Sequence, residues 1–135
     1  MRPAARAALL VAALALVAAK APPPVDWSKY ADVQTIEVVS TDEDGGSRLT
    51  TIWIVIVDGQ PYIRTHATTW GDNVEREGTL KLREPGYDRP LRAEKVLSQR
   101  EVERVVAAFR EKYGSTDAWL EWIRFGEVRV FRLVE

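Results

Sequence analysis

Arginine, histidine and tryptophan side chains follow the most hydrophobic part of the sequence at close spacing. Residues 50–70 read TTIWIVIVDGQPYIRTHATTW and include Arg64, His66 and Trp70. A guanidinium binds a phosphate or carboxylate through two parallel hydrogen bonds, and a threonine hydroxyl such as that of Thr65 can add another. This stretch therefore predicts a site for a small anionic ligand.

Catalytic side chains are not indicated by the sequence. His66 is the single histidine, and a lone histidine is more often a hydrogen-bonded surface group than a base or a metal ligand. The chain has no cysteine, which excludes a thiolate nucleophile and a cysteine-ligated metal. It also has no G-x-S-x-G motif of a serine hydrolase, and the acidic run 41–46 lacks the spaced oxygens of a calcium loop. We expect no catalytic side chain and no metal site.

A two-residue turn at Asp58-Gly59 fixes how the strands around it pair. Asp-Gly favours a type I′ hairpin turn, because both positions must accept a positive φ. Pro61 then falls in a pair without backbone hydrogen bonds, where its missing N–H costs nothing. The register predicts the pairs Val57–Gln60, Ile56–Pro61, Val55–Tyr62, Ile54–Ile63, Trp53–Arg64, Ile52–Thr65 and Thr51–His66.

Directly paired residues share a face of the sheet, so this hairpin has two faces of different character. The aliphatic face is predicted to be core and holds Ile52, Ile54, Ile56, Ile63 and Thr65. The mixed face holds Thr51, Trp53, Val55, Tyr62, Arg64 and His66. Two interpretations of the mixed face stay open, namely a ligand site or cation–π packing of Arg64 on Trp53 worth about 0.5–2 kcal/mol.

The remaining patterns predict a mainly β chain with two or three short helices. A capping box at 98–101 predicts the start of a helix, and Gly114 predicts its end. This helix has a single apolar stripe. Residues 68–76 predict a short helix or an irregular turn, and residues 116–125 a second short helix. Six strands are expected, at 33–40, 48–57, 60–66, 80–83, 89–97 and 127–134. Tight turns join most of them, so the sheet should be antiparallel, and the strand that is apolar on both faces should lie within a barrel or under a helix.

Residues 1–21 have the features of a secretory signal segment. A basic start precedes an unbroken apolar run from Ala7 to Ala19 that is short for a membrane span. Cleavage after Ala19 is favoured over cleavage after Ala21, and an uncleaved membrane anchor is the alternative. We expect an exported, periplasmic or secreted protein with a Pro-rich linker over 22–32 and one domain over 33–135.

Charge and tryptophan content restrict the partners of the mature chain. Three of the 19 basic residues lie in residues 1–21, which leaves 16 basic against 20 acidic residues, a net charge of −4. An acidic domain argues against nucleic acid as a partner. The five tryptophans are more than one small core readily accommodates, and aromatic residues are enriched at interfaces. A homodimer is therefore expected.

The sequence resembles the flavin- and deazaflavin-binding split-barrel proteins related to pyridoxamine 5′-phosphate oxidase. The resemblance lies in R-x-T-T-I-W-I-V-x-V-D-G-x-x-Y-I-R-T, then T-T-W-x-x-N, then a strand pair and a capped helix that ends F-R-E-K-Y-G. It covers residues 33–134 and is nearest to a branch known as a domain of unknown function. It implies a six-stranded antiparallel split barrel, usually a homodimer, with an FMN or deazaflavin cofactor at the subunit interface.

By position, the resemblance places the cofactor on the second and third strands and the turn that follows. Together with Trp53 from the hairpin, the candidate cofactor-binding residues are Arg48, Thr50, Thr51, Arg64, Thr65, Thr69 and Trp70, with Asn73 as a weaker one. The family turn often has a basic residue after its Ser or Thr, and the turn 68–71 has none. The expected function is that of a cofactor-binding redox protein; the alternative is a non-enzymatic ligand-binding or envelope interaction module.

Overall fold

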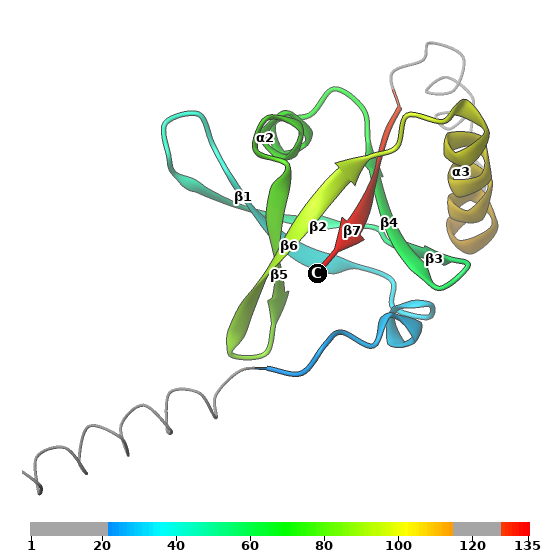
Figure 1. Ribbon diagram of the computed structural model, residues 1–135, viewed down its shortest axis with the longest axis horizontal. Helices are drawn as coiled ribbons and strands as arrows, with labels where there is room; N and C mark the ends of the chain where they lie inside the picture. The colour runs from blue at the N-terminus through cyan, green and yellow to red at the C-terminus, as the bar shows by residue number, and fades with distance from the viewer. Residues whose placement is uncertain (1–21, 115–127) are drawn as a thin grey trace, which may run out of the picture.

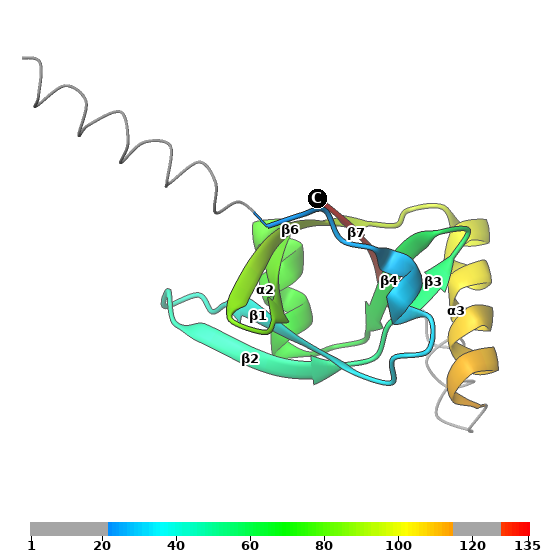
Figure 2. The same cartoon turned by 90° about the horizontal axis from the view of Figure 1, so that it is seen from below.

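The described residues form one antiparallel sheet that curls into a half-barrel (Figures 1 and 2). The computed structural model describes residues 22–114 and 128–135. Its strands lie in the order β2-β1-β5-β6-β7-β4-β3. They are β1 (Ile36–Thr41), β2 (Ser47–Ile52), β3 (Val55–Val57), β4 (Gln60–Thr65), β5 (Thr79–Glu84), β6 (Tyr87–Lys95) and β7 (Arg129–Val134). The predicted mainly β, antiparallel fold class is confirmed.

Hydroxyl side chains start both α-helices of the described ranges. The helices are α2 (Thr69–Glu77) and α3 (Gln99–Tyr113), and a 3-10 helix, η1 (Trp27–Tyr30), precedes the sheet. Thr68 caps α2 and Ser98 caps α3, as expected for residues that accept from orphan amides. α2 contacts β1, β5 and β6, and α3 stands against β3 (Figure 1). Among the described residues no helix is long and apolar enough to cross a membrane; the helix predicted at 116–125 lies outside them.

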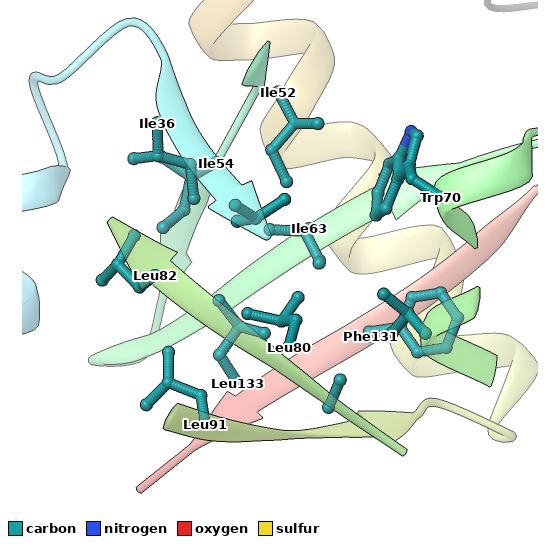
Figure 3. Close-up of a cluster of buried hydrophobic side chains, with 13 residues drawn as sticks. Ile36, Ile52, Ile54, Ile63, Trp70, Leu80, Leu82, Leu91, Phe131 and Leu133 are labelled. Carbon is teal, nitrogen blue, oxygen red and sulfur yellow. The ribbon is translucent and has the colours of Figure 1, made fainter. Parts of the chain in front are cut away.

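Two apolar clusters stabilise the sheet. The larger lies inside the curl and includes the predicted aliphatic face, with Ile52, Ile54 and Ile63 buried (Figure 3). The smaller lies under α3 and contains Val55, Tyr62, Val96, Val105, Val106, Phe109 and Val130. The apolar stripe of α3 is therefore buried, as predicted. Val55 and Tyr62 pair and lie apart from the aliphatic face, as predicted, but both are buried under α3, so this part of the mixed face is core and not open to a ligand.

The hairpin turn has the predicted geometry. Asp58 and Gly59 have φ values of 51° and 76°, the positive angles that a type I′ turn requires at both positions. The three predicted pairs nearest the turn form, namely Val57–Gln60, Ile56–Pro61 and Val55–Tyr62. Turn chemistry therefore fixes the register only over this short distance.

The predicted strand 48–57 is divided into two strands, because the chain changes neighbours in its middle. β2 pairs with β1 at one edge of the sheet, and β3 pairs with β4 at the other edge. Trp53 and Ile54 lie between them and belong to neither strand. Seven strands in the described residues replace the predicted six. The four pairs predicted beyond the break do not form: Ile54–Ile63, Trp53–Arg64, Ile52–Thr65 and Thr51–His66.

Side chains from the end of α3 replace the missing strand neighbour at this break. The Ile54 N–H donates to Tyr113 Oη at 3.1 Å. The Ile54 carbonyl accepts from Lys112 Nζ at 2.7 Å and lies 2.9 Å from Tyr113 Oη. Because an unpaired buried backbone group is costly, these contacts allow the chain to change neighbours and keep its backbone hydrogen bonds.

Lys112 also holds the N-terminal segment against the sheet. Its ammonium lies 3.2 Å from the Tyr30 carbonyl and 2.7 Å from the Val33 carbonyl. Trp27 and Tyr30 pack against the larger apolar cluster, so the aromatic residues after the proline run dock on the sheet. One lysine thus joins the N-terminal segment, the strand break and α3.

We predict that Lys112→Met lowers the free energy of unfolding by about 1.5–3 kcal/mol, because three carbonyls lose a charged donor. Urea denaturation measures the change. The matched control is Lys95→Met, which removes an exposed ion pair with Glu75 and should cost at most about 1 kcal/mol. Equal losses in the two variants would show that the Lys112 contacts contribute little.

Candidate cofactor-binding cleft

A cleft of about 270 Å³ lies where the strand break separates the end of β2 from the end of β4. The first turn of α2 closes one side of it. The cleft is lined by Thr51, Ile52, Trp53, Arg64, Thr65, His66, Thr68 and Trp70. Five predicted binding residues meet here, namely Thr51, Trp53, Arg64, Thr65 and Trp70. Their binding roles stay predictions, but they are brought together by the gap between two strands and not by the pairing that we expected.

Arg64 carries positive charge into the cleft. Its guanidinium carbon lies 5.6 Å from the centre of the Trp53 ring and 5.0 Å from the centre of the Phe109 ring. Burial lowers the pKa of Arg64 to about 10, so the side chain is a cation at neutral pH. The cation–π contact that was one interpretation of the hairpin face is therefore present, although Arg64 and Trp53 are not a ladder pair. It places a partly desolvated cation between aromatic rings, where an anion would be attracted strongly.

Trp53 forms a partly exposed wall of the cleft. Its side chain is 39% exposed. Behind it, the Tyr113 ring is stacked in parallel, with the ring centres 4.1 Å apart and an angle of 2° between the planes. Tyr113 does not itself line the cleft, and its stacking restricts the movement of the Trp53 ring.

Thr65, Thr68 and Gly71 form a tight junction between β4 and α2. The two threonine hydroxyls are 2.6 Å apart, and the Gly71 N–H donates to Thr68 Oγ1 at 3.2 Å. A Cβ on Gly71 would lie 2.5 Å from Thr65 Cγ2 and 2.8 Å from Thr68 Oγ1. Glycine is thus required for the helix to approach the strand so closely. Because these two hydroxyls already hydrogen-bond to each other, their main role is to hold β4 and α2 together.

Arg129 holds this junction from the side of β7. It donates to the His66 carbonyl at 2.6 Å and forms ion pairs with Asp72 at 3.0 Å and Glu75 at 2.8 Å. Its charge is balanced by these two carboxylates. Among the described residues that line the cleft, Arg64 therefore supplies the permanent positive charge.

Three predicted binding residues, Arg48, Thr50 and Thr69, do not line the cleft. Arg48 forms an ion pair with Asp42 at 2.8 Å, at the far end of β2. Thr69 is exposed and lines a different depression at the start of α2, together with Asp42 and Asn73. The weaker candidate Asn73 is buried and donates to Asp42 at 2.7 Å. Position in the family pattern was therefore insufficient to assign these residues, because Arg48 lies at the other end of β2 and Thr69 and Asn73 line the depression beside Asp42.

Two residues that support the cleft, Tyr113 and Arg129, were not predicted from the sequence. Tyr113 belongs to the F-R-E-K-Y-G motif, which predicted the end of a helix but no contact with the cleft. Arg129 lies on the last strand, more than sixty residues after His66, and carries no local signal for this contact. Thr68 was placed only in the turn 68–71; it caps α2 and also lines the cleft.

Comparison with protein families places the chain. A family model described as "Uncharacterized protein conserved in bacteria (DUF2255)" matches residues 26–128, which is most of the sequence. The chain belongs to this family. A comparison with curated proteins finds no match.

Several solved structures share the fold. They include a conserved hypothetical protein from Mycobacterium tuberculosis (TM-score 0.59, 20% identity, 83% of this chain and 81% of that chain). They also include the heme storage protein HutZ from Vibrio cholerae (0.62, 15%, 79% and 85%) and a putative pyridoxamine 5′-phosphate oxidase from Listeria innocua (0.57, 14%, 79% and 87%). These likenesses confirm the predicted resemblance to the split-barrel superfamily, and at such identities they concern the fold.

We predict that Gly71→Ala lowers the free energy of unfolding by about 1–3 kcal/mol, because the methyl group would overlap Thr65 and Thr68. Thermal or urea denaturation measures the loss. The control is Gly46→Ala on the exposed hairpin loop, where the nearest atom is the mobile carboxylate tip of Asp44 at 3.0 Å. An alanine at 71 that is tolerated as well as one at 46 would contradict the tight junction.

Proposed function

We propose that this protein binds a small-molecule cofactor of the flavin type, FMN or a deazaflavin, in the cleft between β2, β4 and α2. The observation that carries the proposal is the setting of Arg64, a cation held beside the Trp53 and Phe109 rings and open to a cleft. Such a site suits a ligand with an anionic group and a planar ring. The structural neighbour titled as a putative pyridoxamine 5′-phosphate oxidase supports this ligand class.

The residues of the cleft fit parts of such a cofactor. Arg64 would bind its phosphate through two hydrogen bonds, with the exposed hydroxyl of Thr51 beside it. Trp53 would pack on its ring, and the buried Trp70 would form the end of the cleft. The cofactor would supply the hydride chemistry, and the protein would bind and orient it, so no side-chain base is required.

The size of the cleft favours a site completed by a second copy of the chain. Ligand pockets for such molecules usually measure about 300–1,000 Å³, and the cleft measures about 270 Å³. The cleft thus lies just below the usual range, and we propose that a second copy of the chain completes it. A homodimer with the cleft at its interface would enclose the rest of the ligand, and a mature chain that sediments as a monomer at micromolar concentration would contradict this.

A non-enzymatic ligand-binding or envelope interaction module is the second candidate. It is favoured by the charge of the site: the turn 68–71 has no basic residue, and Arg129 is occupied by Asp72 and Glu75. One structural neighbour is titled as a heme storage protein, which offers another planar anionic ligand. The signal-like segment 1–21 supports export. Export favours this second candidate, because a binding module outside the cytoplasm does not need to be loaded with a flavin.

The two candidates are separated by titrating the mature chain with FMN, a deazaflavin and heme. We predict that Arg64→Ala weakens binding of the anionic ligand by about 10- to 100-fold, since a charged donor is lost. Arg64→Lys keeps the charge but loses the planar fork, so binding should weaken by about 3- to 10-fold with little change in thermal stability. Fluorescence quenching for the flavins and the absorption band of heme report affinity.

The matched control is Arg83→Ala, which removes a guanidinium that is paired with Asp88 at 3.0 Å on the turn between β5 and β6. Its ligand affinity should equal that of the parent. If Arg64→Ala lowers the melting temperature and leaves every affinity unchanged, Arg64 is a packing residue and the cleft is not the site. Binding of heme but of neither flavin would favour the second candidate.

A further inference from the structure

Tyr113 connects the end of α3 to two segments that are far from it in the sequence. Its ring is stacked on Trp53 at 4.1 Å. Its hydroxyl accepts from the Ile54 N–H at 3.1 Å and lies 2.8 Å from the Gln34 carbonyl and 2.9 Å from the Ile54 carbonyl. One side chain therefore touches the cleft wall, the strand break and the segment that leads into β1.

The direction of the hydroxyl proton follows from the neighbouring lysine. A tyrosine hydroxyl has one proton to donate, and the Ile54 carbonyl already accepts from Lys112 Nζ at 2.7 Å. The Tyr113 proton is therefore best used on the Gln34 carbonyl. In this arrangement Tyr113 bridges the Ile54 N–H to Gln34.

Lys112 contacts the same parts on the neighbouring position of α3. Its ammonium bonds the carbonyls of Tyr30 and Val33 as well as that of Ile54, and it lies 5.0 Å from the centre of the Tyr113 ring. Lys112 and Tyr113 thus contribute both to the docking of residues 30–34 and to the backbone hydrogen bonds at the strand break. Loss of either side chain should loosen the docked segment and the strand break together.

We propose that Tyr113 is a positioning residue for the cleft and that, with Lys112, it couples the docking of residues 30–34 to the position of the Trp53 ring beside Arg64. The inference rests on the proposed function for its effect on a ligand, but the coupling itself is a property of the free protein. A wall that is already fixed before binding costs less conformational entropy when the ligand arrives. Removing its support should therefore weaken binding although Tyr113 lies behind the wall.

The test compares two Tyr113 variants and Lys112→Met with a control on the same helix. Tyr113→Leu removes the stacked ring and the hydroxyl, whereas Tyr113→Phe keeps the ring and removes the hydroxyl. Val105→Ala is the control, because Val105 is fully buried on the same helix in the core under α3 and its truncation lowers stability through a cavity. Two ligand-free readouts are the near-ultraviolet circular dichroism of Trp53, taken as the difference from Trp53→Phe, and hydrogen exchange of the Ile54 amide. FMN affinity is the third readout.

We expect Tyr113→Leu to lose most of the Trp53 signal and to lower FMN affinity by about 3- to 10-fold. The Ile54 amide should exchange at least about 10-fold faster in both Tyr113 variants, since its acceptor is gone. Tyr113→Phe should keep most of the Trp53 signal, and Val105→Ala should keep that signal and the affinity. Lys112→Met removes the ammonium beside the Tyr113 ring and should reduce the Trp53 signal as well.

The proposal is overturned if Tyr113→Leu and Val105→Ala change the Trp53 signal and the Ile54 exchange equally, because Tyr113 would then act only through stability. If FMN does not bind the parent, the two ligand-free readouts still decide the coupling, while the proposed flavin function fails separately. If the readouts change as expected but affinity is unaltered, Tyr113 does not position the cleft and the proposal is wrong.

Discussion

The backbone hydrogen bonds of Ile54, at the break between β2 and β3, impose the constraint on which the rest of this structure depends. A sheet that curls has two edges, and here the same stretch of chain, 48–57, supplies both of them. The chain must leave β1 before it can reach β4, and the residues between lose strand neighbours on the way. Lys112 and Tyr113 supply the missing partners for Ile54. The position of α3 and the curl of the sheet are thus fixed by the same contacts.

The cleft follows from this change of neighbours. Had the hairpin continued in its initial register, the end of β2 would have paired with the end of β4, and no space would remain between them. The break moves these ends apart, and polar and aromatic side chains from both line the gap. The tight contact of Gly71 with Thr65 and Thr68 then sets the first turn of α2 beside it, and Arg129 holds that turn through two carboxylates. A ligand site is therefore built where the sheet fails to close.

Local features of the fold could be predicted from the sequence, and features that depend on distant partners could not. The Asp58-Gly59 turn, the Ser98 cap and the apolar stripe of α3 are each encoded within a few residues, and all three are present. The strand break has no such signal, because β-branched residues, which favour strands, stand on both sides of it, at 50–52 and at 54–57. The split-barrel resemblance predicted the architecture. It also implied six strands, with residues 48–57 as one continuous strand, and so did not indicate the break.

Among the site residues, the same distinction holds. Arg64 and Trp53 were expected to meet as a strand pair. They do meet, but Trp53 lies outside the strands, so the curl of the sheet brings them together and not the predicted pairing. Arg48, Thr50 and Thr69 were assigned by position in the family pattern, and their side chains lie away from the cleft. Tyr113 approaches Trp53 only through the packing of α3, sixty residues along the chain, so no local pattern could indicate it.

The central claim is that the gap opened by the strand break is the ligand site, and a chemical-shift titration of the mature protein with FMN tests it most directly. The account predicts that the perturbed backbone amides cluster at Thr51–Trp53 and Arg64–Thr68. The control surface is the separate groove over β1, β5 and β6, lined in part by Val39, Lys81 and Arg92, whose amides should not move. Perturbations centred on that groove, with the residues around the break unchanged, would contradict the account.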